Sequence, residues 1–394
     1  MQKYIMSNCH ASDEFQTKDK TWDDLDINPK LLRGVYSYGF ETPSPIQRKA
    51  IGPMTSGGDL IAQAQSGTGK TGAFSIGILN NINVDINENQ AIIISPTREL
   101  AMQIYDFNLQ ISKYMKGICI KLLIGGVSSD TDIAEMRKNK PHLIIGTPGR
   151  INDMLRRNYI SSNTIKNITL DEADEMLSSG FKEQVYNIFQ YFSQNIQICL
   201  FSATLPEEVK DLTSKFLREP QRIFIEKTML TLEGISQHYV AIDSDQAKYI
   251  TLKDLYKHIS VSQCIIYCNS VKRVMDLYDA MLGDEYPVGR IHSSMDKQER
   301  IESYNDFKNG KTRVLISSNL TARGIDIQQV STIINFDLPR DVHTYLHRIG
   351  RSGRWGRKGV AINFVTRFDC RRIKEFEEFY ETQITELPAS FVEM

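Results

Sequence analysis

Ala64-Gln65-Ser66-Gly67-Thr68-Gly69-Lys70-Thr71 follows the apolar run Leu60-Ile61-Ala62 and opens a stretch compatible with a helix. A glycine-rich turn at a helix N-terminus presents backbone N–H groups and the positive end of the helix dipole to phosphate oxygens. Lys70 adds a positive charge for the outer phosphates, and the hydroxyl of Thr71 can ligate Mg²⁺. The stretch therefore predicts a nucleoside triphosphate site; the alternative is a flexible surface turn.

An acidic tetrad, Asp171-Glu172-Ala173-Asp174, follows Thr169-Leu170, the end of an apolar run. Open α/β sheets deliver the residues at the carboxyl ends of their strands to a ligand crevice. Taken alone, such a tetrad is more often a solvated turn. Together with the glycine-rich turn, it strengthens the prediction of a nucleoside triphosphate site.

Length and composition predict a globular protein of two domains. The chain has 394 residues, 41% of them hydrophobic and 24% charged, and is too long for one ordinary core. No apolar stretch approaches the roughly 18 residues of a membrane span. The first twenty residues are polar, unlike a secretory signal. We therefore expect no membrane association and a cytoplasmic location, with a nuclear location as the alternative.

The cysteine spacing argues against disulfides and zinc sites, and the net charge gives no sign of a nucleic-acid partner. The six cysteines are scattered and form no close CxxC pair, which favours reduced thiols over disulfides or zinc ligands. The formal net charge is −1, so overall charge does not indicate a nucleic-acid partner. Any binding of nucleic acid must come from local geometry.

Apolar strands alternate with helical patterns twice along the chain, which is typical of parallel α/β sheets. The first set of predicted strands is Asp59–Ala62, Ala91–Ser95, Cys119–Ile124, His142–Ile145, Ile168–Leu170 and Ile196–Phe201. The second set is Cys264–Tyr267, Val288–His292, Arg313–Ser317, Thr332–Asn335 and Val360–Phe364. Between the two sets, residues 219–234 include Pro220 and lack sustained periodicity, so we predict a hinge there.

With these motifs in this order, the chain from Trp22 to about Pro388 resembles the DEAD-box RNA helicases, and within them the translation initiation factor 4A subfamily. The resemblance implies an α/β fold of two tandem RecA-like domains, each a mostly parallel sheet flanked by helices. The expected division is a short extension at 1–21, a first domain at 22–219, a flexible linker at 220–234 and a second domain at 235–394.

The resemblance implies that a segment before the glycine-rich turn reads adenine. Gly39-Phe40-Glu41-Thr42-Pro43-Ser44-Pro45-Ile46-Gln47 looks like the family's Q motif, in which the glutamine amide pairs a donor and an acceptor on the base. Phe40 would stack on the base, and Trp22 is either a brace for this segment or a plain core aromatic. The positions expected to bind ATP are Phe40, Gln47, Ser66, Gly67, Thr68, Gly69, Lys70, Thr71 and Asp326.

The family's catalytic roles map onto both halves of the chain. Asp171 and Thr71 would hold Mg²⁺, and Glu172 would orient and deprotonate the attacking water. In the run His347-Arg348-Ile349-Gly350-Arg351-Ser352-Gly353-Arg354, two arginines match the fingers that reach the γ-phosphate. The expected catalytic residues are Lys70, Glu172, Arg351 and Arg354. The residues expected to couple hydrolysis to domain closure are Asp174, Ser202, Thr204 and His347.

RNA contacts are expected from small residues and exposed N–H groups in both domains. They would read the RNA backbone and 2′-OH, with little sequence preference. Arg98 and Arg150 would either neutralise phosphates or brace the loops. The expected positions are Pro96, Thr97, Arg98, Gly126, Thr147, Gly149, Arg150, Asn269, Arg300, Ser318 and Gly324.

The resemblance therefore implies an ATP-dependent RNA helicase, a monomer whose partner is a scaffold protein resembling initiation factor 4G. Lys297 and Asn319 depart from the family pattern and make the strength of unwinding an open question. One alternative is an ATP-gated RNA clamp in splicing, export or another RNA–protein assembly. A processive DNA translocase is disfavoured by the adenine-reading motif and the acidic tetrad.

Overall fold

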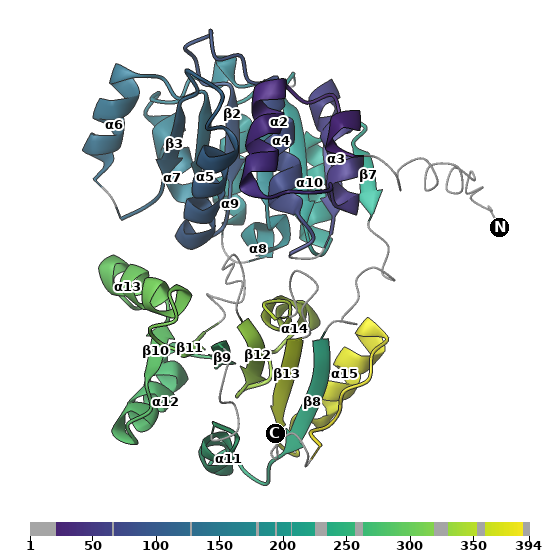
Figure 1. Cartoon of the computed structure of the whole chain (residues 1–394), viewed down its shortest axis with the longest axis vertical. Coiled ribbons are helices and arrows are strands. Elements are labelled where there is room, and N and C mark those ends of the chain that lie inside the picture. The colour runs from purple at the N-terminus through teal and green to yellow at the C-terminus, as the bar shows by residue number, and fades with distance from the viewer. Residues whose placement is uncertain are drawn as a thin grey trace, which may run out of the picture. The chain divides into compact units, whose positions relative to one another are not determined.

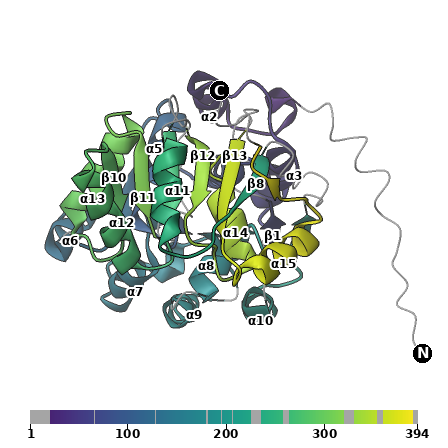
Figure 2. The same cartoon turned by 90° about the horizontal axis from the view of Figure 1, so that it is seen from below.

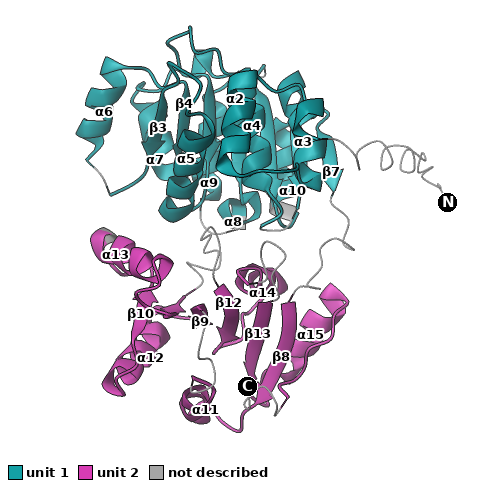
Figure 3. Cartoon of the chain, viewed as in Figure 1, with its two compact units in different colours: residues 1–230 teal, residues 231–394 magenta. Residues whose placement is uncertain are grey.

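The computed structural model describes residues 21–64, 67–126, 128–178, 181–193, 195–205, 207–224, 235–256, 263–318, 330–352 and 359–388. The chain divides into two compact units, residues 1–230 and residues 231–394 (Figure 3). Within the described ranges, no helix is both long enough and apolar enough to cross a bilayer.

Unit 1 is built on a seven-stranded parallel sheet in the order β3-β4-β2-β5-β6-β1-β7. Its inner strands are nearly continuous apolar runs because helices cover both faces of the sheet. The strands are β1 (Leu60–Gln63), β2 (Ala91–Ile94), β3 (Ile120–Leu123), β4 (Leu143–Gly146), β5 (Asn167–Asp171), β6 (Gln197–Ser202) and β7 (Gln221–Phe224).

The helices of unit 1 form a layer on each face of this sheet (Figure 1). Alternate residues of β2 show the division: Ile93 packs with α2 to α5, whereas Ile92 and Ile94 pack with α6 to α10. The helices are η1 (Trp22–Asp24), α2 (Pro29–Tyr38), α3 (Pro45–Ser56), α4 (Lys70–Asn81), α5 (Arg98–Ile111), α6 (Ser129–Lys138), α7 (Pro148–Arg156), η2 (Ser162–Thr164), α8 (Ala173–Ser178), α9 (Lys182–Gln190) and α10 (Glu207–Phe216).

Unit 2 repeats the scheme with a parallel sheet in the order β10-β11-β9-β12-β13-β8-β14. The strands are β8 (Ile235–Ala241), β9 (Gln263–Tyr267), β10 (Val288–Ile291), β11 (Val314–Ser317), β12 (Val330–Asn335), β13 (Gly359–Val365) and β14 (Thr385–Glu386). Among the described residues, helices cover both faces of this sheet (Figure 2). The first face carries α11 (Ala247–Tyr256) and α12 (Val271–Gly283), and the second carries α13 (Lys297–Lys308), α14 (Val342–Ile349) and α15 (Cys370–Tyr380).

The predicted fold class, parallel sheets flanked by helices in two units, is confirmed. One correction concerns Gln221–Phe224, assigned above to the linker 220–234: it forms β7, which pairs in parallel with β1. Three of its four residues are exposed, so it lacks the apolar run that marks an inner strand. The rest of the predicted linker, residues 225–234, lies outside the described residues.

Candidate nucleotide and RNA sites

The glycine-rich turn joins β1 to α4 in unit 1. Gly69 caps α4 with φ of +99°, a left-handed conformation that glycine adopts without strain. A Cβ at this position would lie 2.7 Å from Nε2 of Gln47 and 2.8 Å from Oγ of Ser44, so a side chain here would displace the Q motif. Gly67, Thr68 and Thr71 lie in the same turn and the start of α4, and Ser66 lies outside the described residues.

The Lys70 side chain is buried beside the acidic tetrad. Its Nζ donates a hydrogen bond to the carbonyl of Ala64 at 3.0 Å and lies 3.8 Å from Oε1 of Glu172. Both side chains are 6% exposed. A buried charge is tolerated where it is paired, so each of the two charges lowers the cost of burying the other.

Asp171 ends β5, and Glu172 follows with φ of +52°. This conformation is strained for a residue with a side chain, and such strain is concentrated at functional sites. Oδ1 of Asp171 accepts a hydrogen bond from the Glu172 N–H at 3.0 Å. Burial, with a further contribution from the Glu172 charge, raises the pKa of Asp171 to about 7, and Lys70 opposes this rise. The Asp171 carboxylate and the Thr71 hydroxyl are the hard oxygen donors that suit Mg²⁺.

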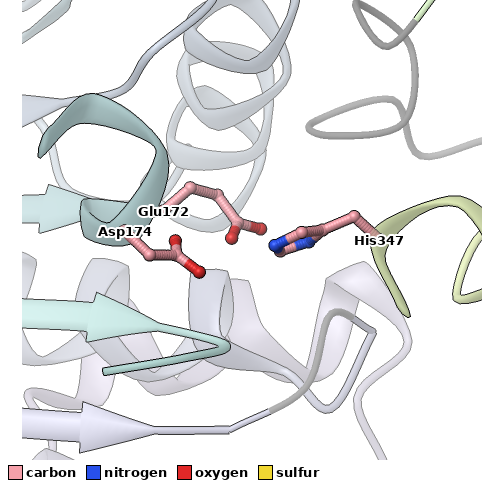
Figure 4. A group of neighbouring side chains, drawn as sticks. All are labelled: Glu172, Asp174 and His347. Atoms are coloured by element: carbon pink, nitrogen blue, oxygen red, sulfur yellow. The ribbon is translucent and has the colours of Figure 1, made fainter. Parts of the chain in front are cut away.

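Asp174, Ser202 and Thr204, three of the residues expected to couple hydrolysis to closure, are joined by hydrogen bonds at the start of α8. The Thr204 hydroxyl donates to Oδ2 of Asp174 at 2.6 Å, and the Asp174 N–H donates to Oγ of Ser202 at 3.2 Å. Figure 4 draws the side chains of Glu172 and Asp174, and also that of His347, which is buried on α14 in unit 2. Within unit 1, these bonds attach the segment after β6 to the acidic tetrad.

Gln47 ties the Q motif to the glycine-rich turn. Its Oε1 accepts from the Ser44 N–H at 2.7 Å, and its Nε2 donates to the carbonyl of Gly69 at 3.2 Å. A glutamine amide has two donor hydrogens and two acceptor positions, so one of each remains for a base. Sequence reasoning missed Gly72, where a Cβ would lie 2.4 Å from this Nε2. Nothing in the sequence marks Gly72, because the Q motif that requires its small size is distant along the chain.

Phe40 lies in an aromatic cluster. Its ring is stacked on Trp22, with centroids 5.8 Å apart and an interplanar angle of 10°. Tyr38 and Phe107 contact the same ring, with centroids 5.3 and 5.9 Å from it. Trp22 is fully buried, so it is a core aromatic and a brace for Phe40 at once.

The predicted RNA positions of unit 1 follow β2, β3 and β4. Thr97, preceded by Pro96, caps α5 by accepting a hydrogen bond from the Leu100 N–H at 3.2 Å. The Arg98 guanidinium lies over the Gly125–Gly126 backbone: a Cβ on Gly126 would be 2.8 Å from its Nη1. Gly126 also has φ of +83°, so this turn requires glycine for conformation and for space.

Arg150 is held by an ion pair at the start of α7. Thr147 is the N-cap residue of this helix, and Gly149 is its second residue. Its Nη1 contacts Oδ2 of Asp132, whose Oδ1 lies 3.0 Å from Nζ of Lys121. The pairing favours bracing over phosphate neutralisation for Arg150. Sequence reasoning missed Asp132 and Lys121 because they belong to no motif and come from different elements.

In unit 2, Asn269 is engaged within the fold. Its Nδ2 donates to the carbonyl of Leu338 at 2.7 Å, and its Oδ1 accepts from Nη2 of Arg348 at 2.7 Å. Arg300 donates to the carbonyls of Ser293 and Met295 at 3.2 and 3.3 Å. Ser318 follows β11 and is half-buried, and Lys297 begins α13. Four positions noted above lie outside the described residues: Asn319, Gly324, Asp326 and Arg354.

Arg351 follows α14 and is 4% exposed. Its Nε donates to the carbonyl of His347 at 3.3 Å. Arg348, one turn earlier, is fully buried, and burial lowers its pKa to about 10. Sequence reasoning gave Arg348 no role, because a guanidinium with internal partners looks the same in sequence as one that awaits a ligand.

Two family matches cover most of the chain. Residues 44–212 match the DEAD/DEAH box helicase family, and residues 247–356 match the helicase conserved C-terminal domain. The chain is 47% identical over 374 residues to the ATP-dependent RNA helicase eIF4A of Neurospora crassa, covering 95% of this chain and 94% of that protein. The eIF4A of Aspergillus niger is 48% identical over the same shares of both chains.

Solved structures of RNA-bound helicases are similar to this chain. Dbp5 of S. cerevisiae bound to RNA and ADP BeF3 has a TM-score of 0.87 and 33% identity, covering 94% of this chain and 96% of that chain. Mss116p bound to ssRNA and AMP-PNP has a TM-score of 0.86 and 26% identity, covering 96% and 82%. The fold is thus that of tandem RecA-like domains, and the chain belongs to the DEAD-box family of ATP-dependent RNA helicases, close to the eIF4A proteins.

Proposed function

We propose that this helicase hydrolyses ATP to ADP and phosphate while closing on RNA and unwinding it locally, as a factor resembling eIF4A in translation initiation. The observation that carries the proposal is the buried group formed by Lys70, Asp171 and Glu172 in unit 1. In this group, the residues proposed as the phosphate-binding cation, the metal-binding carboxylate and the general base lie side by side. The similarity to eIF4A proteins along nearly the whole chain supports the pathway.

Phosphoryl transfer is mostly positioning and neutralisation of charge, and the proposed roles follow from that. Lys70 binds the outer phosphates, while Glu172 orients the attacking water and takes its proton. Asp171 and Thr71 would hold Mg²⁺, which would neutralise charge on the phosphoryl oxygens. Arg351, with Arg354 beyond the described residues, supplies the finger charge from unit 2.

The adenine of ATP is proposed to stack on Phe40 and to pair with the remaining donor and acceptor of the Gln47 amide. Gly67, Thr68 and Gly69 are proposed to present their backbone N–H groups to the phosphates. RNA is proposed to bind along its backbone, mainly at the predicted positions of both units. Asn269 and Arg150 are expected to act by holding the neighbouring segments, because their side chains are already bonded within the protein.

The cellular setting is proposed on the resemblance to eIF4A. We expect a cytoplasmic monomer that works with a scaffold protein resembling initiation factor 4G. Two helicase domains, at about 22–224 and 235–394, would be joined by the intervening residues. The predicted coupling residue His347 would serve the communication between hydrolysis and closure.

RNA affinity should depend on the bound nucleotide. If phosphate contacts are divided between two domains, only the ATP state engages all of them, so affinity should rise about 5- to 150-fold, or roughly 1–3 kcal/mol. Fluorescence anisotropy would titrate RNA and single-stranded DNA with ADP and with a non-hydrolysable ATP analogue. Equal affinity in both nucleotide states, or equal binding of RNA and DNA, would refute the proposal. Strand release from a short duplex separates the helicase from an ATP-gated clamp, which would hold the RNA without releasing a strand.

Gly126→Ala should weaken RNA binding about tenfold, or ~1.4 kcal/mol, and leave ATP binding unchanged. The added Cβ would lie 2.8 Å from Nη1 of Arg98 and would displace the guanidinium. Gly117→Ala is the matched control, because Gly117 has a similar φ of +89° but a Cβ there meets only Val84, at 3.9 Å. RNA titration of both variants is the measurement. Equal losses in the two variants would show that backbone strain, not Arg98, is responsible.

A further inference from the structure

α14 is fixed in unit 2 by polar side chains on the face that it turns to the sheet. Tyr345 and Arg348 are three residues apart, lie on one face of the helix and are both fully buried. His347 belongs to the same helix, and Arg351 follows the helix just after its C-cap residue, Gly350. The helix thus has an anchoring face, carries the proposed coupling residue His347, and leads directly into the proposed finger residue Arg351.

The anchoring face belongs to an unbroken chain of hydrogen bonds. Nη1 of Arg348 donates to Oδ1 of Asn335 at 3.1 Å, and Nδ2 of Asn335 donates to Oδ1 of Asn363 at 2.8 Å. Nδ2 of Asn363 then donates to the Tyr345 hydroxyl at 3.3 Å. That hydroxyl donates to Oε1 of Gln237 at 2.8 Å. The series of bonds therefore runs from α14 through β12 and β13, returns to α14 at Tyr345 and ends on β8.

These polar groups lie at buried positions between α14 and the sheet, where apolar side chains could also hold the helix in place. Asn335 and Asn363 are fully buried, and Gln237 is 5% exposed. Burying such groups is unfavourable unless each is paired, and a network that is paired throughout specifies one arrangement. Apolar contacts would hold α14 on the sheet but would tolerate a small slide or rotation. Directional bonds at both Tyr345 and Arg348 set the rotation of the helix about its axis.

The position of Arg351 follows from that of α14. Its N–H donates to the carbonyl of Arg348 at 3.2 Å, and its Nε donates to the carbonyl of His347 at 3.3 Å. Two bonds therefore attach the Arg351 backbone and side chain to the last turn of the helix. A displacement of α14 would carry the guanidinium with it, and misplacement of a catalytic group by about 1 Å can cost on the order of 10² in rate.

We infer that Tyr345 is a positioning residue for hydrolysis: its hydroxyl, through the chain to Asn363 and Gln237, holds α14 so that the Arg351 guanidinium meets the transition state. The inference rests on the proposed finger role of Arg351. Tyr345 itself touches neither nucleotide nor RNA in this scheme. Its side chain is also stacked on Phe376, with centroids 4.5 Å apart, a contact that phenylalanine would keep.

The test is Tyr345→Phe in the full-length protein, assayed as RNA-stimulated ATPase. We expect kcat to fall about tenfold, with KM for ATP within about twofold of wild type, because the loss arises in the transition state. In the double variant, Tyr345→Phe should add no further loss of kcat to that caused by Arg351→Ala alone, since Tyr345 acts only through Arg351. Tyr249→Phe is the matched control and should keep wild-type kcat. Its hydroxyl contacts the carbonyl of Ala280 and Oδ2 of Asp284, each at 2.9 Å, away from α14.

Circular dichroism would verify folding, and Gln237→Leu, which breaks the same chain on β8, gives an independent variant with the same expected fall in kcat. If folded Tyr345→Phe had wild-type kcat while Arg351→Ala was slow, the inference would be overturned and the finger role of Arg351 would stand. Additive losses in the double variant would also overturn it, because they would show an effect that bypasses Arg351. Wild-type kcat in Arg351→Ala would instead refute the finger role, and the inference would fall with it.

Discussion

Glu172→Gln should slow ATP hydrolysis by about 10²- to 10⁴-fold while ATP still binds. Glutamine keeps the length and hydrogen-bonding reach of glutamate but cannot take the proton of the attacking water. Lys70 loses a buried charge partner at 3.8 Å and keeps its bond to the carbonyl of Ala64, so the phosphate-binding cation stays in place. The variant should therefore remain closed on RNA with ATP bound. Single-turnover hydrolysis and RNA dissociation with ATP are the two measurements.

Glu175→Gln is the matched control for that variant. Glu175 belongs to α8, carries the same substitution and has no proposed part in the chemistry. It should hydrolyse ATP at the wild-type rate. Wild-type turnover in Glu172→Gln would contradict the general-base assignment. Loss of nucleotide binding in Glu172→Gln would instead make Glu172 a residue that maintains the site, acting through Lys70.

Arg351→Ala should lower kcat by about 10³-fold or more and leave ATP affinity close to that of wild type. A finger residue acts on charge that develops in the transition state, so its removal affects the rate and spares ground-state binding. Lys70→Ala should show the opposite pattern, with weakened nucleotide binding, because a buried cation that holds the phosphates acts in both states. Nucleotide titration with a non-hydrolysable analogue and steady-state ATPase assays separate the two patterns.

Arg372→Ala supplies the control for a lost arginine in the same unit. Its side chain is 33% exposed, and its guanidinium pairs with Asp369, the N-cap residue of α15. It should hydrolyse ATP normally, since a partly exposed ion pair far from the proposed chemistry contributes little. If Arg351→Ala lost ATP binding but hydrolysed normally at saturation, Arg351 would be a binding residue and not a finger.

The fold and the chemistry are predictable where the information is contiguous. An apolar run such as Ala91–Ile94 predicts a buried parallel strand by itself, and a glycine-rich turn followed by Lys70 predicts a phosphate site without reference to the rest of the chain. The strand prediction missed β7, β8 and β14, because a strand that is partly exposed has no continuous apolar run. The motifs likewise identified the candidate residues but carried no information about the side chains that surround them.

By itself, the sequence determined which residue types stand at the ends of the parallel strands, and with them the class of reaction. The tertiary structure decided what those side chains do inside each unit. It pairs Gln47 with Gly69, lays Arg98 over Gly126 and commits Arg348 to the sheet beneath α14. In each pair the partners come from separate elements, and the crossover connections between parallel strands bring them together. The sequence around a guanidinium or an amide does not show whether its partner is within the protein or on a ligand. Packing determines this, because packing fixes the distance between the groups and their desolvation.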